Sequence, residues 1–185
     1  NGTRTSKTVD GVTHTYTLEG TKILHERWGD NTLVPLYDNE DCVCGILYND
    51  IAYYFVRNLQ NDIIEIVNDN AEPVAKYSYD AWGACTITQD VSRCNIASVN
   101  PFRYRSYYYD EETSLYYLQS RYYAATVGRF INADCKLGTE PGTLSYALHS
   151  YCNNSPVISE DPLGTWFFNV LKVVAKVIAP VAIVA

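Results

Sequence analysis

Residues 52–83 read AYYFVRNLQNDIIEIVNDNAEPVAKYSYDAWG. Short runs rich in aromatic and β-branched residues alternate with clusters of Asn, Asp and Gly. Apolar and polar residues alternate within 63–67 and 74–79, which is typical of half-buried strands. The clusters at 68–71 and 80–83 have the composition of hairpin turns. We therefore predict antiparallel β-hairpins.

The same pattern fills roughly the first 125 positions, and its turns recur with a period. Tyr37-Asp38 and Tyr79-Asp80 lie 42 positions apart, and Tyr16 lies 21 before Tyr37. A unit of about 21 residues indicates a repeat architecture, in which each hairpin buries its face against its neighbours. A β-sandwich with evenly spaced strands is the alternative.

Composition supports a β-rich chain with one sizeable core. Among 185 residues there are 17 Tyr, 5 Phe and no Met, and 47% of the chain is hydrophobic. Tyrosine suits a pleated surface on which the ring packs and the hydroxyl reaches a partner. The net charge is −7, so the basic footprint of a nucleic-acid-binding protein is missing. We expect no nucleic acid to bind this segment.

The two ends and the cysteines set the context. Neither end has the flanks of a secretory signal or of a membrane anchor, so we expect a longer polypeptide that carries any export signal elsewhere.

No CxxC pair occurs, and the nearest approach to a metal motif is His149-x-x-Cys152. We predict no metal and no cofactor, with small, buried cysteines as the better interpretation of the six thiols. The cysteines are at positions 42, 44, 85, 94, 135 and 152.

Two further stretches carry a family resemblance. PFRYRSYYYDEETSLYYLQSRYYAATVGRFINAD (101–134) closely resembles the signature of the RHS repeat-associated core, and 52–83 resembles the tyrosine-aspartate (YD) repeat unit of RHS proteins. The match continues through SYALHSYCNNSPVISEDPLG (145–164), so it covers roughly residues 15–164.

The resemblance implies a mainly β fold with three parts. Residues 1–125 would be tyrosine-rich antiparallel hairpin repeats, forming the last turns of a spiral, hollow RHS shell and the start of the core signature. Residues 126–165 would form a plug that closes the shell. Residues 166–185 would be an apolar helix that leads to a C-terminal region beyond this chain.

The resemblance also implies a function. In polymorphic toxins and insecticidal Tc-toxin components, the shell encloses a variable C-terminal toxin, and the plug is an aspartyl protease that cuts the chain. We expect a secreted or cell-surface bacterial toxin whose partners are its own cargo and the rest of its shell. In teneurins and wall-associated relatives the shell serves display or adhesion, so a non-cleaving surface shell is the alternative.

The expected catalytic residues are Asp134, Asp161 and Arg121. Two facing carboxylates can divide the roles of base and acid, because like charges in contact do not both ionise. The family motif matches Asp134, Asp161 and, in its RYY element, Arg121, whose guanidinium would orient a carboxylate or stabilise an oxyanion. Alternatively, both aspartates are turn formers and Arg121 pairs with an acid at a sheet edge.

The expected cleavage site is the Thr165–Trp166 bond, directly after Asp161-Pro-Leu-Gly164. Several positions depart from the family pattern. The first Asp-Pro-x-Gly element reads Asp134-Cys-Lys-Leu-Gly138, positions 124–125 are Ala-Ala, and Thr165 replaces the usual leucine. These departures bear on the efficiency of cutting.

Other polar groups were weighed as sites. His149 and Cys152 have the spacing of a nucleophile and its base on a helical turn, but plug packing is the preferred interpretation. His14 and His25 are predicted to be surface strand residues. The acidic triplet 110–112 is predicted to be a hairpin turn.

The tail after Trp166 is apolar except for Asn169, Lys172 and Lys176, which recur at helical spacing until Pro180. Its length would just cross a bilayer, but two lysines and an asparagine disfavour a stable span. A helix packed in the core or lumen and a membrane-active leader remain open alternatives.

Overall fold

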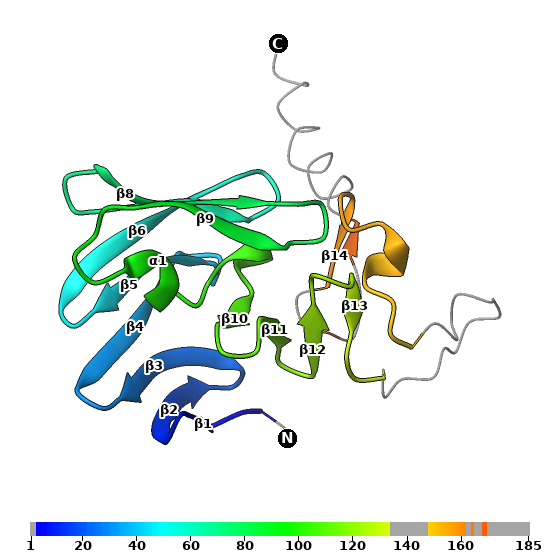
Figure 1. Cartoon of the computed structure of the whole chain (residues 1–185), viewed down its shortest axis with the longest axis horizontal. Helices are drawn as coiled ribbons and strands as arrows, with labels where there is room; N and C mark the ends of the chain where they lie inside the picture. The colour runs from blue at the N-terminus through cyan, green and yellow to red at the C-terminus, as the bar shows by residue number, and fades with distance from the viewer. Residues whose placement is uncertain (1–2, 134–147, 162–163, 165–167, 170–185) are drawn as a thin grey trace, which may run out of the picture.

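The computed structural model describes residues 3–133, 148–161, 164 and 168–169, and these residues form two main β-sheets. The first sheet has nine antiparallel strands in strict sequence order, so each strand pairs with the strands before and after it (Figure 1). Its strands are β1 (Ser6–Val9), β2 (Val12–Glu19), β3 (Lys22–Trp28), β4 (Asn31–Tyr37), β5 (Val43–Tyr48), β6 (Ile51–Arg57), β7 (Ile63–Val67), β8 (Pro73–Tyr79) and β9 (Cys85–Asp90). The prediction of mainly antiparallel hairpins is confirmed.

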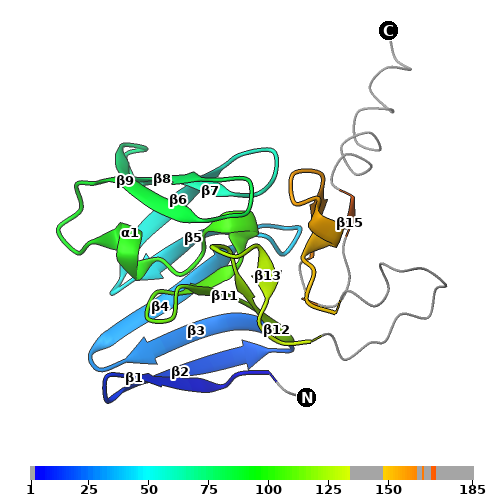
Figure 2. The same cartoon turned by 45° about the vertical axis from the view of Figure 1, so that its right-hand side comes forward.

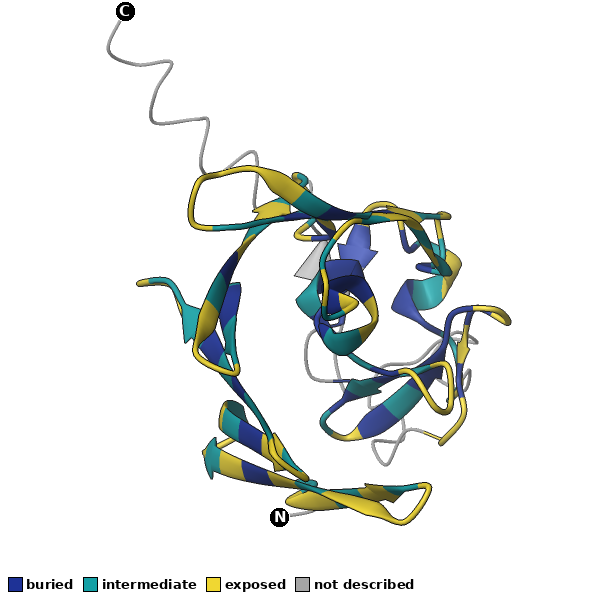
Figure 3. Ribbon diagram, turned by 60° about the vertical axis from the view of Figure 1, so that its left-hand side comes forward, coloured by how far each residue is buried: buried dark blue, intermediate teal, exposed yellow. Residues whose placement is uncertain are grey.

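The second sheet is shorter and lies inside the curve of the first (Figures 2 and 3). It contains β10 (Tyr108–Asp110), β11 (Leu115–Leu118), β12 (Arg121–Ala124) and β13 (Arg129–Phe130). A further antiparallel pair joins β14 (Ser159–Glu160) to β15 (Phe168–Asn169). One short helix that the sequence did not suggest, α1 (Ile96–Val99), packs against β8 and β9.

A recurring side-chain turn closes hairpins of the first sheet, including both Tyr-Asp positions. Asp38 Oδ1 accepts hydrogen bonds from the backbone N–H groups two and four residues later, at 3.0 and 2.9 Å. The same pair of bonds recurs at Asn58, Asn68 and Asp80. An Asx side chain that caps its own turn closes the hairpin without help from distant residues. The Asx residue that follows each of these strands therefore fixes the hairpin turn after it.

Bulges help to curl the first sheet. The register between paired strands shifts within β4, β6, β7 and β8. Each extra residue bends its strand and increases the right-handed twist, so the nine strands wrap around an interior and do not lie flat. Figure 3 shows the resulting arc, with buried residues alternating with more exposed ones along the strands.

The first core fills this concave side. Alternate residues of the strands point inward, as at Leu33, Ile46 and Ile66, which are almost completely buried. Ile96 and Ala97 of α1 close one end of the core, where Tyr77 Oη donates to the carbonyl of Ala97 at 2.8 Å. The hydroxyl at the ring's far end thus satisfies a helix carbonyl inside the core.

Tyrosine rings pack against one another across the strands of the second sheet. Ring centroids of Tyr109 and Tyr116 lie 4.8 Å apart across β10 and β11, and those of Tyr116 and Tyr123 lie 6.3 Å apart across β11 and β12. Tyr151 adds a ring 4.2 Å from Tyr123. The last residues before β14 are therefore packed onto the same aromatic core.

Ion pairs fasten the N-terminal strand to the second sheet. Asp110 is 2% exposed and receives Arg4 Nη1 at 2.5 Å and Lys7 Nζ at 2.7 Å. The predicted hairpin turn at 110–112 is confirmed, because the Thr113 N–H donates to the Asp110 carbonyl at 3.2 Å, but the burial of the Asp110 carboxylate at the end of β10 is not something the sequence predicts. Glu111 and Glu112 do lie in the turn.

His14 lies on a strand, as predicted, but its side chain is largely buried and not on the surface. Its ring stacks on Trp28 with centroids 5.0 Å apart, and Nδ1 lies 2.7 Å from Oε1 of the buried Glu26. Tyr108 Oη donates to the same carboxylate at 2.8 Å. His14 therefore belongs to a seam between β2, β3 and β10.

Of the predicted C-terminal helix, residues 166–185, the structure describes only 168–169, and these form the strand β15, so the prediction of helix is wrong at these two positions. The other residues of the predicted helix lie outside the described part of the chain. Within the described part of the chain, no helix has the length and apolar character needed to cross a membrane. Residues on both sides of position 125 contribute to the second sheet, and the division into repeats, plug and tail stays a prediction.

Candidate functional site

Arg121 is the centre of the candidate site. It begins β12, and the alternation of that strand directs its side chain into the interior, where it is 6% exposed. The guanidinium lies 3.6 Å above the Phe130 ring, Nη2 lies 3.1 Å from Asp161 Oδ2, and Nη1 donates to the Leu148 carbonyl at 3.2 Å. Nε donates to the carbonyl of Gly164. One planar cation therefore joins three segments that are distant in sequence.

Asp161 directly follows β14 and is 3% exposed. Its backbone N–H donates to Tyr107 Oη at 3.0 Å, and that hydroxyl lies 3.1 Å from Tyr151 Oη. Burial raises the pKa of Tyr151 well above its ordinary value, so this hydroxyl stays protonated at neutral pH. The Arg121 guanidinium thus binds the carboxylate of Asp161, and the Tyr107 hydroxyl accepts a hydrogen bond from its backbone N–H. Together these two contacts fix the orientation of Asp161.

Gly164 approaches the β11–β12 turn so closely that only glycine fits. Its φ is +67°, and an added Cβ would lie 2.8 Å from the Leu118 carbonyl oxygen and 2.9 Å from Ser120 Oγ. Ser120 Oγ donates to the Gly164 carbonyl at 2.8 Å. The glycine of the DPLG turn is therefore required both by its left-handed backbone and by close packing.

The structure brings together two of the predicted catalytic residues, Arg121 and Asp161. The third, Asp134, lies outside the described residues, as do both members of the predicted cleavage site, Thr165 and Trp166. The carboxylate dyad and the scissile bond stay predictions. Reasoning from the sequence missed Tyr107 and Ser120, although Ser120 directly precedes the RYY element.

A second buried arginine fixes the segment before β14 to the first sheet. Arg105 Nη2 donates to the Pro156 carbonyl at 2.6 Å, and Nη1 donates to the Gln60 carbonyl at 2.9 Å. Gln60 in turn donates from Nε2 to the Val157 carbonyl at 2.6 Å. The β6–β7 turn and the chain leading to Asp161 are therefore held together directly.

His149 and Cys152 do not form a catalytic pair within the described structure. His149 Nδ1 faces the Phe130 carbonyl at 3.1 Å, which makes this nitrogen the donor. Cys152 is buried in the aromatic cluster around Tyr151. The packing interpretation is supported for Cys152, whereas His149 is exposed. Among the described residues, no group of three His, Cys, Asp or Glu side chains could hold a metal ion.

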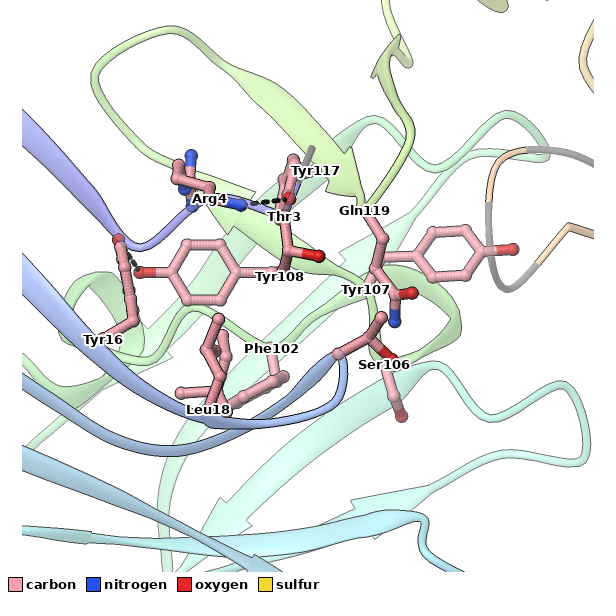
Figure 4. Close-up of a pocket in the computed structure, with 12 residues that line it drawn as sticks. Thr3, Arg4, Tyr16, Leu18, Phe102, Ser106, Tyr107, Tyr108, Tyr117 and Gln119 are labelled. Atoms are coloured by element: carbon pink, nitrogen blue, oxygen red, sulfur yellow. Dashed lines mark hydrogen bonds between the residues drawn. The ribbon is translucent and has the colours of Figure 1, made fainter. Parts of the chain in front are cut away.

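A small cavity of about 120 Å³ lies between the N-terminal strands and the second sheet (Figure 4). Tyr16, Tyr108 and Tyr117 line it, and the Arg4 guanidinium carbon lies 4.4 to 5.2 Å from the centroids of these three rings. Tyr16 Oη and Tyr108 Oη lie 3.1 Å apart, and the Arg4 backbone N–H donates to Tyr117 Oη. The Arg4 guanidinium and these hydroxyl groups thus have cation–π and hydrogen-bond partners within the protein. The cavity is therefore part of the packing between the N-terminal strands and the second sheet.

Comparisons with known proteins agree with this architecture. The Teneurin YD-shell family model matches residues 18–157. The tRNA nuclease WapA of Bacillus subtilis strain 168 is 37% identical over 175 residues, which is 92% of this chain and 7% of that protein. Toxin protein Tse5 of Pseudomonas aeruginosa is 40% identical over 65 residues, which is 35% of this chain and 5% of Tse5.

Solved structures share the fold. The crystal structure of TcdB2-TccC3-Cdc42 matches with a TM-score of 0.69 and 20% identity, covering 89% of this chain and 8% of that one. The chain therefore spans less than a tenth of the length of these relatives. With the curled hairpin sheet and its repeated Asx turns, these matches show that the chain belongs to the RHS/YD-repeat family.

Proposed function

We propose that this chain is the C-terminal shell and plug of a secreted bacterial polymorphic toxin, which cuts its own backbone between Thr165 and Trp166. The observation that carries the proposal is the buried pair of Arg121 and Asp161, whose guanidinium also binds the carbonyl of Gly164. The Arg121 guanidinium, the Asp161 carboxylate and Gly164, the residue before Thr165, thus meet at one point. A site that cuts the Thr165–Trp166 bond requires such groups beside that bond.

The proposed reaction is hydrolysis by two carboxyl groups, Asp134 and Asp161. One carboxylate accepts a proton from water while the water oxygen attacks the carbonyl carbon of Thr165. The other carboxyl group donates its proton to the departing nitrogen of Trp166 as the carbon–nitrogen bond breaks. The products are a carboxylate at Thr165 and an amine at Trp166, and each chain reacts once. Arg121 orients Asp161 and supplies positive charge beside the developing oxyanion.

The partners of the proposed toxin are its own C-terminal cargo and the rest of its shell. Named relatives include a toxin and tRNA nucleases, and these names describe proteins of which this chain matches less than a tenth. The acidic chain, with net charge −7, is the wall of the enclosure in this proposal, and the active toxin follows Ala185. The apolar tail either packs in the lumen or inserts into a membrane.

The test uses the protein with its native N- and C-terminal extensions. Intact-mass measurement and N-terminal sequencing should find two pieces, with Trp166 at the new N-terminus. Asp134→Asn and Asp161→Asn should each leave the chain whole, because asparagine keeps the turn preference but does not ionise. A wild-type chain that stays whole from mildly acidic to neutral pH would favour a passive display shell. Cutting that survives both changes would assign the work to another protease.

A further inference from the structure

Two side-chain donors from one turn converge on the carbonyl of Gly164. Ser120 Oγ donates to it at 2.8 Å, and Arg121 Nε donates to the same oxygen. We propose that Ser120 is a positioning residue that, with Arg121, sets which bond of the chain is cut; this inference rests on the proposed function.

The turn that carries these donors is rigid. Leu118 pairs with Arg121 across β11 and β12, so Gln119 and Ser120 form a two-residue hairpin loop. Gln119 has a φ of +59°, and the Ser120 N–H donates to the Leu118 carbonyl at 2.6 Å. Tight two-residue loops hold their side chains in a defined direction relative to the strands. The hydroxyl is thus presented by the same framework that holds Arg121.

The acceptor is fixed equally well. The backbone of Gly164 is in the left-handed region and packs against Leu118, and its N–H donates to the Asp161 carbonyl at 3.4 Å. On the far side of the predicted cleavage site, Phe168 pairs with Glu160 in the β14–β15 ladder. The backbone is therefore anchored both before and after residues 165–167.

Anchoring on both sides selects one peptide group for attack. Holding reacting groups in the correct geometry removes much of the entropic barrier to reaction, and a displacement of about 1 Å lowers rates strongly. Ser120 does not touch the predicted scissile bond, so it acts through the position of Gly164. Loss of its hydroxyl should loosen the register of the segment that is cut.

The experiment follows cutting of the full-length protein by pulse–chase after cell-free synthesis, with the new N-termini sequenced. Ser120→Ala is compared with Ser120→Thr, which restores a hydroxyl, and with Ser106→Ala as a matched control. Ser106 Oγ also donates to a backbone carbonyl, that of Asn61, at 2.9 Å but away from the site. Thermal stability is measured for each variant in an Asp161→Asn background, in which no cutting is expected.

We expect Ser120→Ala to slow cutting by about tenfold, the effect of one lost hydrogen bond, or to produce N-termini beside Trp166. Ser120→Thr should restore rate and position, and Ser106→Ala should change neither. Wild-type rate and a single N-terminus in Ser120→Ala would overturn the inference while leaving the proposed function intact. So would slower cutting matched by an equal loss of thermal stability. A wild-type chain that stays whole would overturn the proposed function and the inference with it.

Discussion

Arg121 Nη2 lies 3.1 Å from Asp161 Oδ2 in the folded chain, although 40 positions separate the two residues. Both side chains are buried, and the same guanidinium also donates to the carbonyls of Leu148 and Gly164. Removing one partner of such a pair leaves an uncompensated charge in the interior. The pair is therefore sensitive to the shape of the cation as well as to its charge.

Arg121→Lys should slow cutting by at least about tenfold while lowering the free energy of unfolding by only about 1–2 kcal/mol, because lysine keeps the charge but loses the planar fork. Pulse–chase of cutting and urea unfolding in an Asp134→Asn background, which keeps the Arg121–Asp161 pair, measure the two effects. Arg129→Lys, at an exposed position of β13, is the control. Unchanged cutting in Arg121→Lys would contradict the role given to the fork.

Gly83→Ala should destabilise the fold by about 3 kcal/mol, since overpacking and a left-handed backbone both oppose the new methyl group. The φ of Gly83 is +90°, and an added Cβ would lie 2.5 Å from Cδ1 of Tyr104. Gly29→Ala is the matched control, because Gly29 also has positive φ, +52°, but no atom within 4 Å of the added Cβ. It should cost about 1 kcal/mol. If urea unfolding shows that Gly83→Ala and Gly29→Ala lower the free energy of unfolding equally, the β8–β9 turn is not tightly packed.

Arg105→Lys should destabilise the protein by about 3 kcal/mol, because the buried guanidinium serves two carbonyls from different segments and lies beside the buried Asp62. The β6–β7 turn should also separate from the chain before β14, which limited proteolysis would detect as faster cutting near Val157. Arg57→Lys changes a half-exposed pair with Asp38 and should cost much less, because exposed ion pairs contribute little to stability. If the chain near Val157 resists proteolysis in Arg105→Lys as it does in the wild type, Arg105 does not hold these two segments together.

Alkaline conditions should unfold the protein cooperatively. Burial is the main cause that raises the pKa of Tyr37 and of Tyr53 to about 12. An unfolded tyrosine ionises near pH 10, so the unfolded chain loses protons first as pH rises. The stabilisation is complete below about pH 10 and is lost towards pH 12.

Absorbance at 295 nm and circular dichroism against pH should therefore change together. Tyr53→Phe should weaken the pH dependence of stability between about pH 10 and pH 12. Tyr54→Phe, at an exposed neighbouring position, should leave that pH dependence unchanged. Smooth ionisation of all tyrosines near pH 10 without loss of structure would show that the rings are accessible.

Local features of the fold could be predicted from the sequence. The hairpins follow from strand alternation and from Asx residues such as Asp38 and Asp80, which close their turns with bonds to residues at most four positions away. Arg121 and Asp161 were found through an ordered motif and not through any physical property of either residue alone. A motif of this length carries positional information that composition lacks.

Contacts between distant segments could not be predicted. The burial of the Asp110 carboxylate could not be predicted from its place in a hairpin turn, because its partners, Arg4 and Lys7, lie 106 and 103 positions away. His14 was placed on the surface because no local pattern reveals that Trp28 and Glu26 face it across the β2–β3 pair. Ser120 is unremarkable in sequence, and its importance depends on the backbone of Gly164 arriving beside it.

The sequence-ordered pairing of the nine strands has a consequence for the order of folding. Each strand pairs with its immediate predecessor, so loop closure costs little entropy and the wall has low contact order. Contacts such as Gln60 with Val157, 97 positions apart, close much larger loops. We expect hairpins to zip one after another as the chain emerges, with β14 docking last. Pulse-labelled hydrogen exchange should then find the amides of β2–β9 protected before the amide of Asp161. The contacts that close the structure would therefore form only after the last segment of the chain has been synthesised.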